Sequence, residues 1–196
     1  LYQKLNPNFE LQLKPYGRVF ISIPSNAPLP LAIVLPLSFC LSGNSVYVTG
    51  SSKIQPLITA LINVIAPYFP QQIAIWSGKT EELLDHLCEK RLIDLIYFMG
   101  ASTYYANIAE KAARTGAHLI YEGEGRCAYA IDPLLDAHAL KTAVSYIAAS
   151  KQSFAGHMCS APNSIVCSHE QKDYICKRLL EISPAIKIHP DADGNA

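Results

Sequence analysis

Short, continuous apolar runs alternate with helical patterns along almost the whole chain, and this alternation constrains the fold more than any other feature. Seven runs, rich in β-branched and aromatic residues, are predicted to be strands: 18–23, 45–49, 72–76, 95–98, 117–121, 127–131 and 164–167. Apolar strands that alternate with helices are typical of a parallel sheet with helices on both faces. We therefore predict an α/β fold with such a sheet.

The predicted helices are marked by apolar periodicity and by end signals. They cover 29–41, 54–65, a segment from Thr80, a segment up to about 114, 134–150 and a last one through Glu181. We expect Thr80 to cap its helix and Gly116 to end another. Ser168 and Gln171 form a predicted capping box.

Polar loops follow the predicted strands, and ligands of parallel sheets bind where the carboxyl ends of strands meet. Each of these loops carries Gly, Ser, Asn or Glu: 24–28, 49–53, 99–103 and 122–126. A further polar loop, 153–168, places Cys159 between a helical pattern and an apolar run. There a thiol can be exposed as a nucleophile, although a buried structural role is the commoner one for cysteine.

Composition excludes some classes of function and favours others. Lys plus Arg and Asp plus Glu each number 16, and no basic block is present, so nothing points to nucleic acid or an anionic membrane surface. Only 16% of residues are charged, which suggests a homo-oligomer or the remainder of a longer polypeptide as partner. The run 28–41 is too short and proline-interrupted to span a bilayer. Six cysteines without framework spacing favour a reducing cytoplasm.

Three residues on these loops supply what a thiol-dependent reaction needs. The Asn26 amide can donate to an oxyanion, Glu122 or Glu124 can act as a base, and Cys159 can act as the nucleophile. Five segments in this order resemble the motifs of the aldehyde dehydrogenase superfamily. They are PSNAPL at 24–29, TGSS at 49–52, FMGA at 98–101, EGEGR at 122–126 and GHMCSA at 156–161.

The resemblance implies a fold and a chemistry. It implies an arm or linker at 1–16, a Rossmann-like coenzyme-binding domain at 17–125 and the start of a second α/β catalytic domain at 126–196. Cys159 would attack an aldehyde, Asn26 would stabilise the oxyanion, and Glu122 would activate the water that hydrolyses the thioester. The implied cofactor is NAD or NADP, bound by Thr49, Ser51, Ser52, Lys53, Gly100, Ala101 and Gly123.

The chain departs from the family pattern at several positions. Thr49 and Ser52 replace a Lys and a Glu that bind the coenzyme, although Lys53 could compensate and a small residue at 52 could admit a 2′-phosphate. Four further positions differ from the family motifs: Ala101 replaces a Ser, Tyr105 a Gly, His157 a Gln and Glu124 a Gly. The family's catalytic domain also continues beyond the nucleophile for longer than this chain does.

Other interpretations therefore remain open. One is a degenerate, non-catalytic domain with a role in structure or oligomerisation, as at the C-terminus of bifunctional proline-utilisation proteins. Residues 159–161 and 166–167 resemble the pyrroline-carboxylate dehydrogenase of that group, which would imply proline catabolism. Another is a cysteine-dependent hydrolase on an unrelated α/β fold. No metal site is predicted, because the His157/Cys159 and Cys167/His169 pairs have a spacing too short for zinc.

Overall fold

The computed structural model describes residues 14–156 and 158–182, and it divides the chain into two compact units. The first unit is Leu1–Gly123 and the second is Glu124–Ala196. Most of the predicted arm, residues 1–13, lies outside the described residues, as do His157 and the end of the predicted catalytic domain, residues 183–196.

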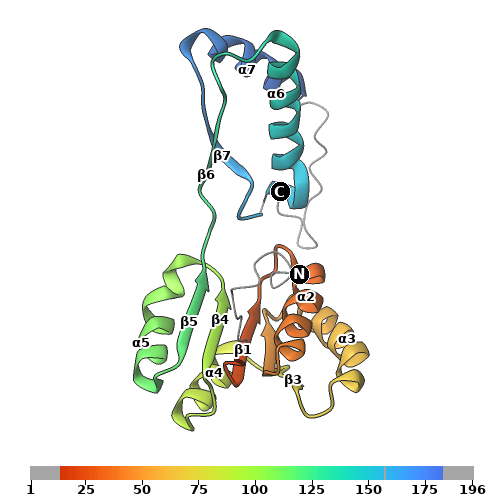
Figure 1. The fold of residues 1–196 in the computed structure, drawn as a ribbon, viewed down its shortest axis with the longest axis vertical. Helices are drawn as coiled ribbons and strands as arrows, with labels where there is room; N and C mark the ends of the chain where they lie inside the picture. Colours follow the sequence, from red (N-terminus) through yellow and green to blue (C-terminus); the bar gives the residue numbers. More distant parts are fainter. Residues whose placement is uncertain (1–13, 157, 183–196) are drawn as a thin grey trace, which may run out of the picture. The chain divides into compact units, whose positions relative to one another are not determined.

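A five-stranded parallel sheet forms the centre of the first unit (Figure 1), as predicted from its apolar runs. Its strands are β1 (Arg18–Ile23), β2 (Ser45–Gly50), β3 (Ile73–Ile75), β4 (Leu95–Met99) and β5 (His118–Glu122). The spatial order is β3-β2-β1-β4-β5, so β1 pairs with β2 on one side and with β4 on the other. The order therefore reverses at β1, and the carboxyl ends of β1 and β4 flank this switch point.

Helices cover both faces of this sheet. On one face, α2 (Pro28–Leu41) and α3 (Gln55–Ile65), followed by the 3₁₀ turn η1 (Ala66–Tyr68), bury a cluster that includes Ile21, Val48 and Ile58. On the other face, α4 (Thr80–Glu89) and α5 (Tyr105–Thr115), the latter preceded by η2 (Ser102–Tyr104), bury Phe20, Leu84 and Ile96. Gly116 ends α5 in the left-handed region with φ +76°, which confirms that end signal.

The amino ends of β1 and β4 are joined by a paired guanidinium and carboxylate. Asp94 accepts hydrogen bonds from Arg18 Nε at 2.9 Å, from Arg18 Nη2 at 3.0 Å and from the Arg18 main-chain N–H at 2.8 Å. The Asp94 N–H donates in turn to the Arg18 carbonyl. These bonds hold the pKa of the Asp94 carboxyl below its ordinary value.

The second unit contains a two-stranded parallel sheet and two helices. Its elements are β6 (Cys127–Ala130), α6 (Ala137–Gln152), η3 (Ser153–Gly156), β7 (Pro162–Val166) and α7 (His169–Ile182). Ile131, Val144 and Ile175 lie in its apolar core. The predicted capping box is confirmed, since the Ser168 and Gln171 side chains each accept the other residue's N–H at 3.3 Å.

Two predictions about local structure are wrong, in each case because another contact prevails. Thr80 does not cap α4; its hydroxyl donates to the Gly50 carbonyl at 3.3 Å, and Lys79 is the N-cap. The helix predicted from 134 begins at Ala137, because the Asp136 side chain caps it by accepting the Ala139 N–H. Trp76, which follows β3, is 40% exposed, and its indole N–H donates to the Lys79 carbonyl at 3.1 Å.

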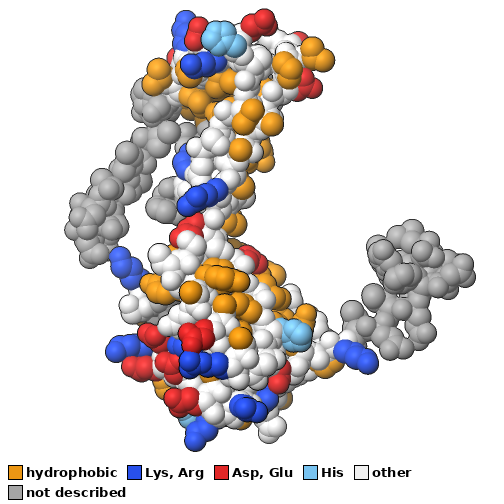
Figure 2. Space-filling model, turned by 90° about the vertical axis from the view of Figure 1, so that its left-hand side faces the viewer, with side chains coloured by type: hydrophobic (Ala, Val, Ile, Leu, Met, Phe, Trp, Pro, Cys, Tyr) orange, Lys and Arg blue, Asp and Glu red, His pale blue; other side chains and the backbone are white. Residues whose placement is uncertain are grey.

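Acidic and basic side chains are interspersed on the surface that α4 and α5 provide, the side of the first unit that faces the viewer in Figure 2. Lys111 of α5 pairs there with Glu81 and Asp85 of α4.

No helix among the described residues is long and apolar enough to cross a membrane. Within residues 14–156 and 158–182, no cluster of three or more His, Cys, Asp or Glu side chains could hold a metal ion.

We predict that Asp94→Asn lowers the free energy of unfolding by about 1 kcal/mol at neutral pH, because this partly exposed pair loses its charge-assisted bonds. The folded-state pKa of Asp94 is depressed, so its contribution is present at neutral pH and disappears as the pH falls through that lowered pKa. Urea unfolding at neutral and acid pH measures both effects. Glu110→Gln, which removes the exposed pair with Arg114, is the control and should change the free energy of unfolding by less. Equal losses in the two variants at neutral pH would contradict this assignment.

Candidate active site

Asn26 lies at the switch point of the first unit. It follows β1 in the turn that leads into α2, and Pro28 occupies the first turn of that helix. The residue is half-buried, and its side-chain Oδ1 atom is buried. The structure thus places this amide at the carboxyl edge of the sheet, as the sequence predicts for a loop that follows a parallel strand.

The carboxyl ends of β2 and β3 are held together by Gln55, a buried residue that belongs to no recognisable sequence motif. Its Oε1 accepts the N–H of Gly50 at 3.0 Å, and its Nε2 donates to the carbonyl of Trp76 at 2.7 Å. Gly50 packs closely on α3, since a Cβ there would lie 2.4 Å from Ile58 Cδ1 and would displace that side chain. The first turn of α3 is therefore fixed against the two strand ends.

The predicted cofactor contacts at the end of β2 fall into two groups. Ser51, Ser52 and Lys53 are exposed at the carboxyl edge. Thr49 is fully buried, and its hydroxyl lies 3.3 Å from that of Thr80. The exposed residues precede the N-terminal turn of α3 and are accessible to a ligand, whereas the Thr49 side chain supports the loop from within.

Aromatic side chains surround the loop at the end of β4. Phe98 and Tyr121 stack with centroids 5.5 Å apart, and Tyr105 meets Tyr121 edge to face at 5.1 Å. The Tyr121 hydroxyl donates to the Ala101 carbonyl, and the Gly100 N–H donates to the Glu122 carbonyl at 3.0 Å. Gly100 and Ala101 are thus fixed beside the end of β5, next to Gly123.

Glu122 ends β5 with an exposed carboxylate that has a specific partner. The Tyr97 phenol of β4 donates a hydrogen bond to Glu122 Oε1. Burial, and then this bond to Glu122, raise the pKa of Tyr97 to about 12. The Tyr97 ring also packs edge to face on Phe39 of α2, with centroids 5.9 Å apart. The carboxylate proposed as a base is thus oriented by a side chain of the neighbouring strand.

Cys159 lies in the second unit, in a turn closed by a 2.9 Å hydrogen bond from the Ala161 N–H to the Met158 carbonyl. Its side chain is exposed, in contrast to Cys40 and Cys88. Burial raises the pKa of the Cys40 thiol to about 11 and raises that of Cys88 as well. Exposure therefore separates Cys159 from the thiols of the first unit.

The peptide of Cys159 packs directly on Gly125, within the second unit. A Cβ at Gly125 would lie 1.5 Å from the Cys159 carbonyl oxygen and 2.6 Å from its Cα. Asn163 fixes this glycine by donating from Nδ2 to its carbonyl at 2.9 Å, and Lys151 Nζ donates to Asn163 Oδ1 at 3.3 Å. Only a glycine at 125 permits this approach of the two chain segments.

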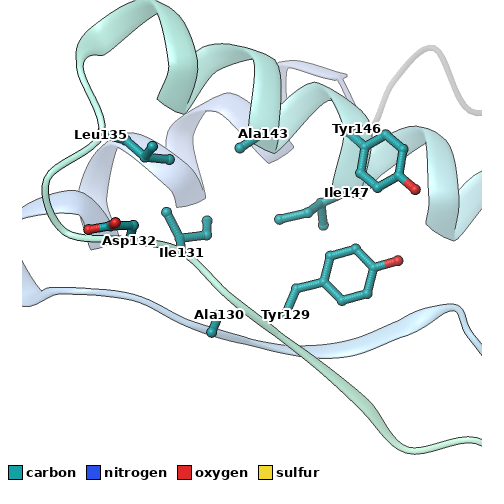
Figure 3. Close-up of a pocket in the computed structure, with 8 residues that line it drawn as sticks. All are labelled: Tyr129, Ala130, Ile131, Asp132, Leu135, Ala143, Tyr146 and Ile147. Atoms are coloured by element: carbon teal, nitrogen blue, oxygen red, sulfur yellow. The ribbon is translucent and has the colours of Figure 1, made fainter.

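A cavity of about 490 Å³ lies beside the turn but does not include Cys159. It is formed between β6 and α6, and the Tyr129 and Tyr146 rings face each other across it, 6.4 Å apart (Figure 3). Its lining is apolar except for Asp132, whose Oδ1 accepts the Leu134 N–H, and the two tyrosine hydroxyls. The Tyr129 hydroxyl donates to the Ser160 carbonyl at 3.5 Å, so one wall of the cavity supports the cysteine turn.

The predicted catalytic residues are divided between the two units. Asn26 and Glu122 belong to the first unit and Cys159 to the second, and the structure describes each within its own unit. Sequence reasoning missed Tyr97 and Asn163, which contact Glu122 and Gly125. A tyrosine within a strand and an asparagine after a proline carry no pattern that reveals a partner distant in sequence.

The chain matches the aldehyde dehydrogenase family model over residues 5–196. It is 26% identical to the D-glyceraldehyde dehydrogenase (NADP(+)) of Picrophilus torridus, over 89% of this chain and 35% of that protein. It is 28% identical to aldehyde dehydrogenase family 3 member B1 of Rattus norvegicus, over 90% of this chain and 38% of that protein. The chain therefore spans little more than a third of the length of these relatives.

Solved structures show the same fold. Betaine aldehyde dehydrogenase from Staphylococcus aureus, in complex with NAD+, aligns with a TM-score of 0.77 at 24% identity, over 93% of this chain and 36% of that one. The NAD-dependent aldehyde dehydrogenase from Sinorhizobium meliloti aligns with a TM-score of 0.76 at 23% identity, over 87% of this chain and 34% of that one. The prediction of a Rossmann-like parallel sheet with helices is confirmed.

We predict that Gly125→Ala displaces the Cys159 turn, because the new methyl group meets backbone atoms that no side-chain rotation can move. The free energy of unfolding should fall by about 1–3 kcal/mol, and the alkylation rate of Cys159 should change. Gly123→Ala is the matched control, since its Cβ would meet only Tyr121 Cε1 at 3.7 Å. Urea unfolding measures the free energy of unfolding, and alkylation followed by peptide mass spectrometry measures the rate at Cys159. Equal values of both quantities in Gly125→Ala and Gly123→Ala would refute the packing argument.

We predict that the phenol of Tyr97 titrates near pH 12, and that Glu122→Gln lowers this pKa because the carboxylate no longer favours the neutral phenol. The stability that Tyr97 contributes is complete below the unfolded pKa of about 10 and is lost as the pH rises through 12. Ultraviolet difference titration against Tyr97→Phe isolates the signal. An unchanged pKa in Glu122→Gln would show that the pair does not form.

Proposed function

The chain belongs to the aldehyde dehydrogenase family, and we propose that it takes part in the NAD(P)-dependent oxidation of an aldehyde to a carboxylic acid. The observation that carries the proposal is Cys159: an exposed thiol in a hydrogen-bonded turn whose peptide packs on Gly125. Both residues stand in segments that match motifs of the family, which supports the nucleophile assignment.

In the proposed reaction, the Cys159 thiolate attacks the carbonyl carbon of the aldehyde. Asn26 donates its side-chain amide to the oxyanion that forms. Bound NAD(P) would supply the hydride acceptor that converts the adduct into a thioester. Glu122, oriented by Tyr97, then accepts a proton from the water that hydrolyses the thioester and releases the acid.

The residues proposed to hold the coenzyme line the carboxyl edge of the first unit. Ser51, Ser52 and Lys53 are exposed there, while Gly100, Ala101 and Gly123 present backbone at the neighbouring strand ends. We assign Thr49 a supporting role, because its buried hydroxyl contacts Thr80. The small side chain of Ser52 and the nearby Lys53 favour NADP over NAD, in keeping with the NADP named for the Picrophilus relative.

A second candidate is a non-catalytic role in assembly, and the observation that favours it is α2. This helix has no charged residue along its 14 positions, and it leaves Leu29 53%, Val34 56% and Leu41 77% exposed. Such exposed apolar side chains fit a second copy of the chain or the remainder of a longer polypeptide. This candidate predicts association that depends on protein concentration and no binding of either coenzyme.

Titration with NADP and with NAD separates the two candidates. Trp76 is the only tryptophan of the chain, and its carbonyl is bound by Gln55 at the carboxyl edge of β3, so its fluorescence reports on the proposed coenzyme site. We expect saturable quenching or enhancement, stronger for NADP. No response to either coenzyme, confirmed by calorimetry, would contradict the dehydrogenase function.

We also predict that iodoacetamide alkylates Cys159 faster than the other five cysteines and that NADP slows this reaction. Peptide mass spectrometry after short exposures measures each site. Cys176 of α7 is the internal control, because it is also exposed and lies outside the proposed site, so its rate should not respond to NADP. Equal slowing at both cysteines would indicate a non-specific effect and would refute the assignment of the site.

A further inference from the structure

A second thiol of the second unit contacts the peptide of Cys159. Cys127, the first residue of β6, donates its S–H toward the Cys159 carbonyl oxygen, with 3.4 Å between sulfur and oxygen. The two residues are 32 positions apart in sequence. The pairing of β6 with β7 brings them together, since Cys127 stands opposite Pro162 at the start of β7 and Cys159 occupies the turn just before that strand.

Packing confines the two cysteines to this neighbourhood. Gly125, two residues before Cys127, presses on the Cys159 peptide, and Asn163, one residue into β7, binds the Gly125 carbonyl at 2.9 Å. The Tyr129 hydroxyl, two residues after Cys127, reaches the Ser160 carbonyl. Contacts on both sides of Cys127 therefore hold its segment against the cysteine turn.

The two thiols differ in their access to solvent. Cys159 is exposed, so a small oxidant can reach it, whereas Cys127 is half-buried beneath the turn. In cysteine oxidation, an accessible thiol reacts first, and a nearby second thiol resolves the product. Among the described residues, no other cysteine is seen in contact with the Cys159 peptide. Cys40 and Cys88 belong to the first unit, while Cys167 and Cys176 follow β7.

We propose that Cys127 is the resolving cysteine for Cys159, and that hydrogen peroxide converts the pair into a reversible disulfide. This modification goes beyond the proposed dehydrogenase function. It depends on the contact between two segments of the second unit and needs neither coenzyme nor aldehyde.

The reaction takes place in two steps. The Cys159 sulfur attacks the peroxide, the O–O bond breaks, and Cys159 becomes a sulfenic acid while the peroxide is reduced to water. The Cys127 sulfur then attacks the Cys159 sulfur; the S–O bond breaks, the S–S bond forms, and a second water leaves with the Cys127 proton. The Cys127 sulfur lies 3.4 Å from the Cys159 carbonyl oxygen, so the step brings the exposed Cys159 side chain toward a sulfur that already contacts its own peptide.

The disulfide would protect the chain against irreversible damage. A sulfenic acid without a resolving thiol is oxidised further by peroxide to a sulfinic acid, which thiol reductants do not reverse. With Cys127 in place, the oxidised chain returns to two free thiols on reduction. If Cys159 is the nucleophile, the same bond blocks catalysis until it is reduced.

The test exposes the whole reduced chain to hydrogen peroxide, blocks free thiols with iodoacetamide and maps the peptides by mass spectrometry. We expect one linked pair that contains Cys127 and Cys159, cleaved by dithiothreitol with recovery of both thiols. In Cys127→Ser, which retains a hydrogen-bond donor, the link is absent and the sulfinic acid at Cys159 is several-fold more abundant at equal peroxide. Cys167→Ser and Cys176→Ser are matched controls and should retain the link.

Three results would overturn the proposal. One is a wild-type chain in which the yield of sulfinic acid at Cys159 equals that in Cys127→Ser. Another is a Cys159 link that goes to a cysteine other than Cys127. A third is a wild-type chain without any link after Cys159 has been oxidised. All three results are measured on wild-type peptides or by comparison with them, so they do not depend on coenzyme binding or on enzymatic activity. A lack of coenzyme binding or of activity would refute only the proposed function.

Discussion

The rest of the structure depends on the burial of β1 between two parallel neighbours. Val19, Phe20 and Ile21 are fully buried, with β2 on one side and β4 on the other, so the strand order reverses at β1. Parallel pairing places the carboxyl ends of all five strands at one edge, which gathers the loops that carry Asn26 and Glu122. The Arg18–Asp94 pair fastens the opposite, amino edge of the same strands.

Much of this fold is predictable from sequence because its signals are local. Continuous apolar runs predict the strands, Gly116 predicts the end of α5, and the Ser168/Gln171 box predicts the start of α7. The predictions fail at positions where tertiary contacts determine the local structure. Thr80 at the start of α4 bonds to the Gly50 carbonyl at the end of β2 instead of capping its helix, and no local pattern reveals this partner.

The candidate site is predictable to a smaller extent. Motif resemblance identifies Cys159 and the segment 122–126, but it does not show that the cysteine peptide packs on Gly125 of that segment, or that Asn163 fixes the contact. Nor does it pair Tyr97 with Glu122, because their contact depends on the register of β4 and β5, which places Tyr97 and Glu122 within two residues of one another across the two strands. These contacts are the features through which the proposed chemistry can be tested in this chain.

The central claim is that Cys159 is the nucleophile and Glu122 the base that releases the acid. Its most direct test is the peptide mass of Cys159 after Glu122→Gln has been incubated with an aldehyde and NADP, or with NAD. Without the base, hydrolysis slows, so we expect an acyl group on Cys159 that Cys159→Ser does not acquire. A chain that gains no acyl mass on Cys159 with either coenzyme, or gains it elsewhere, would contradict the account.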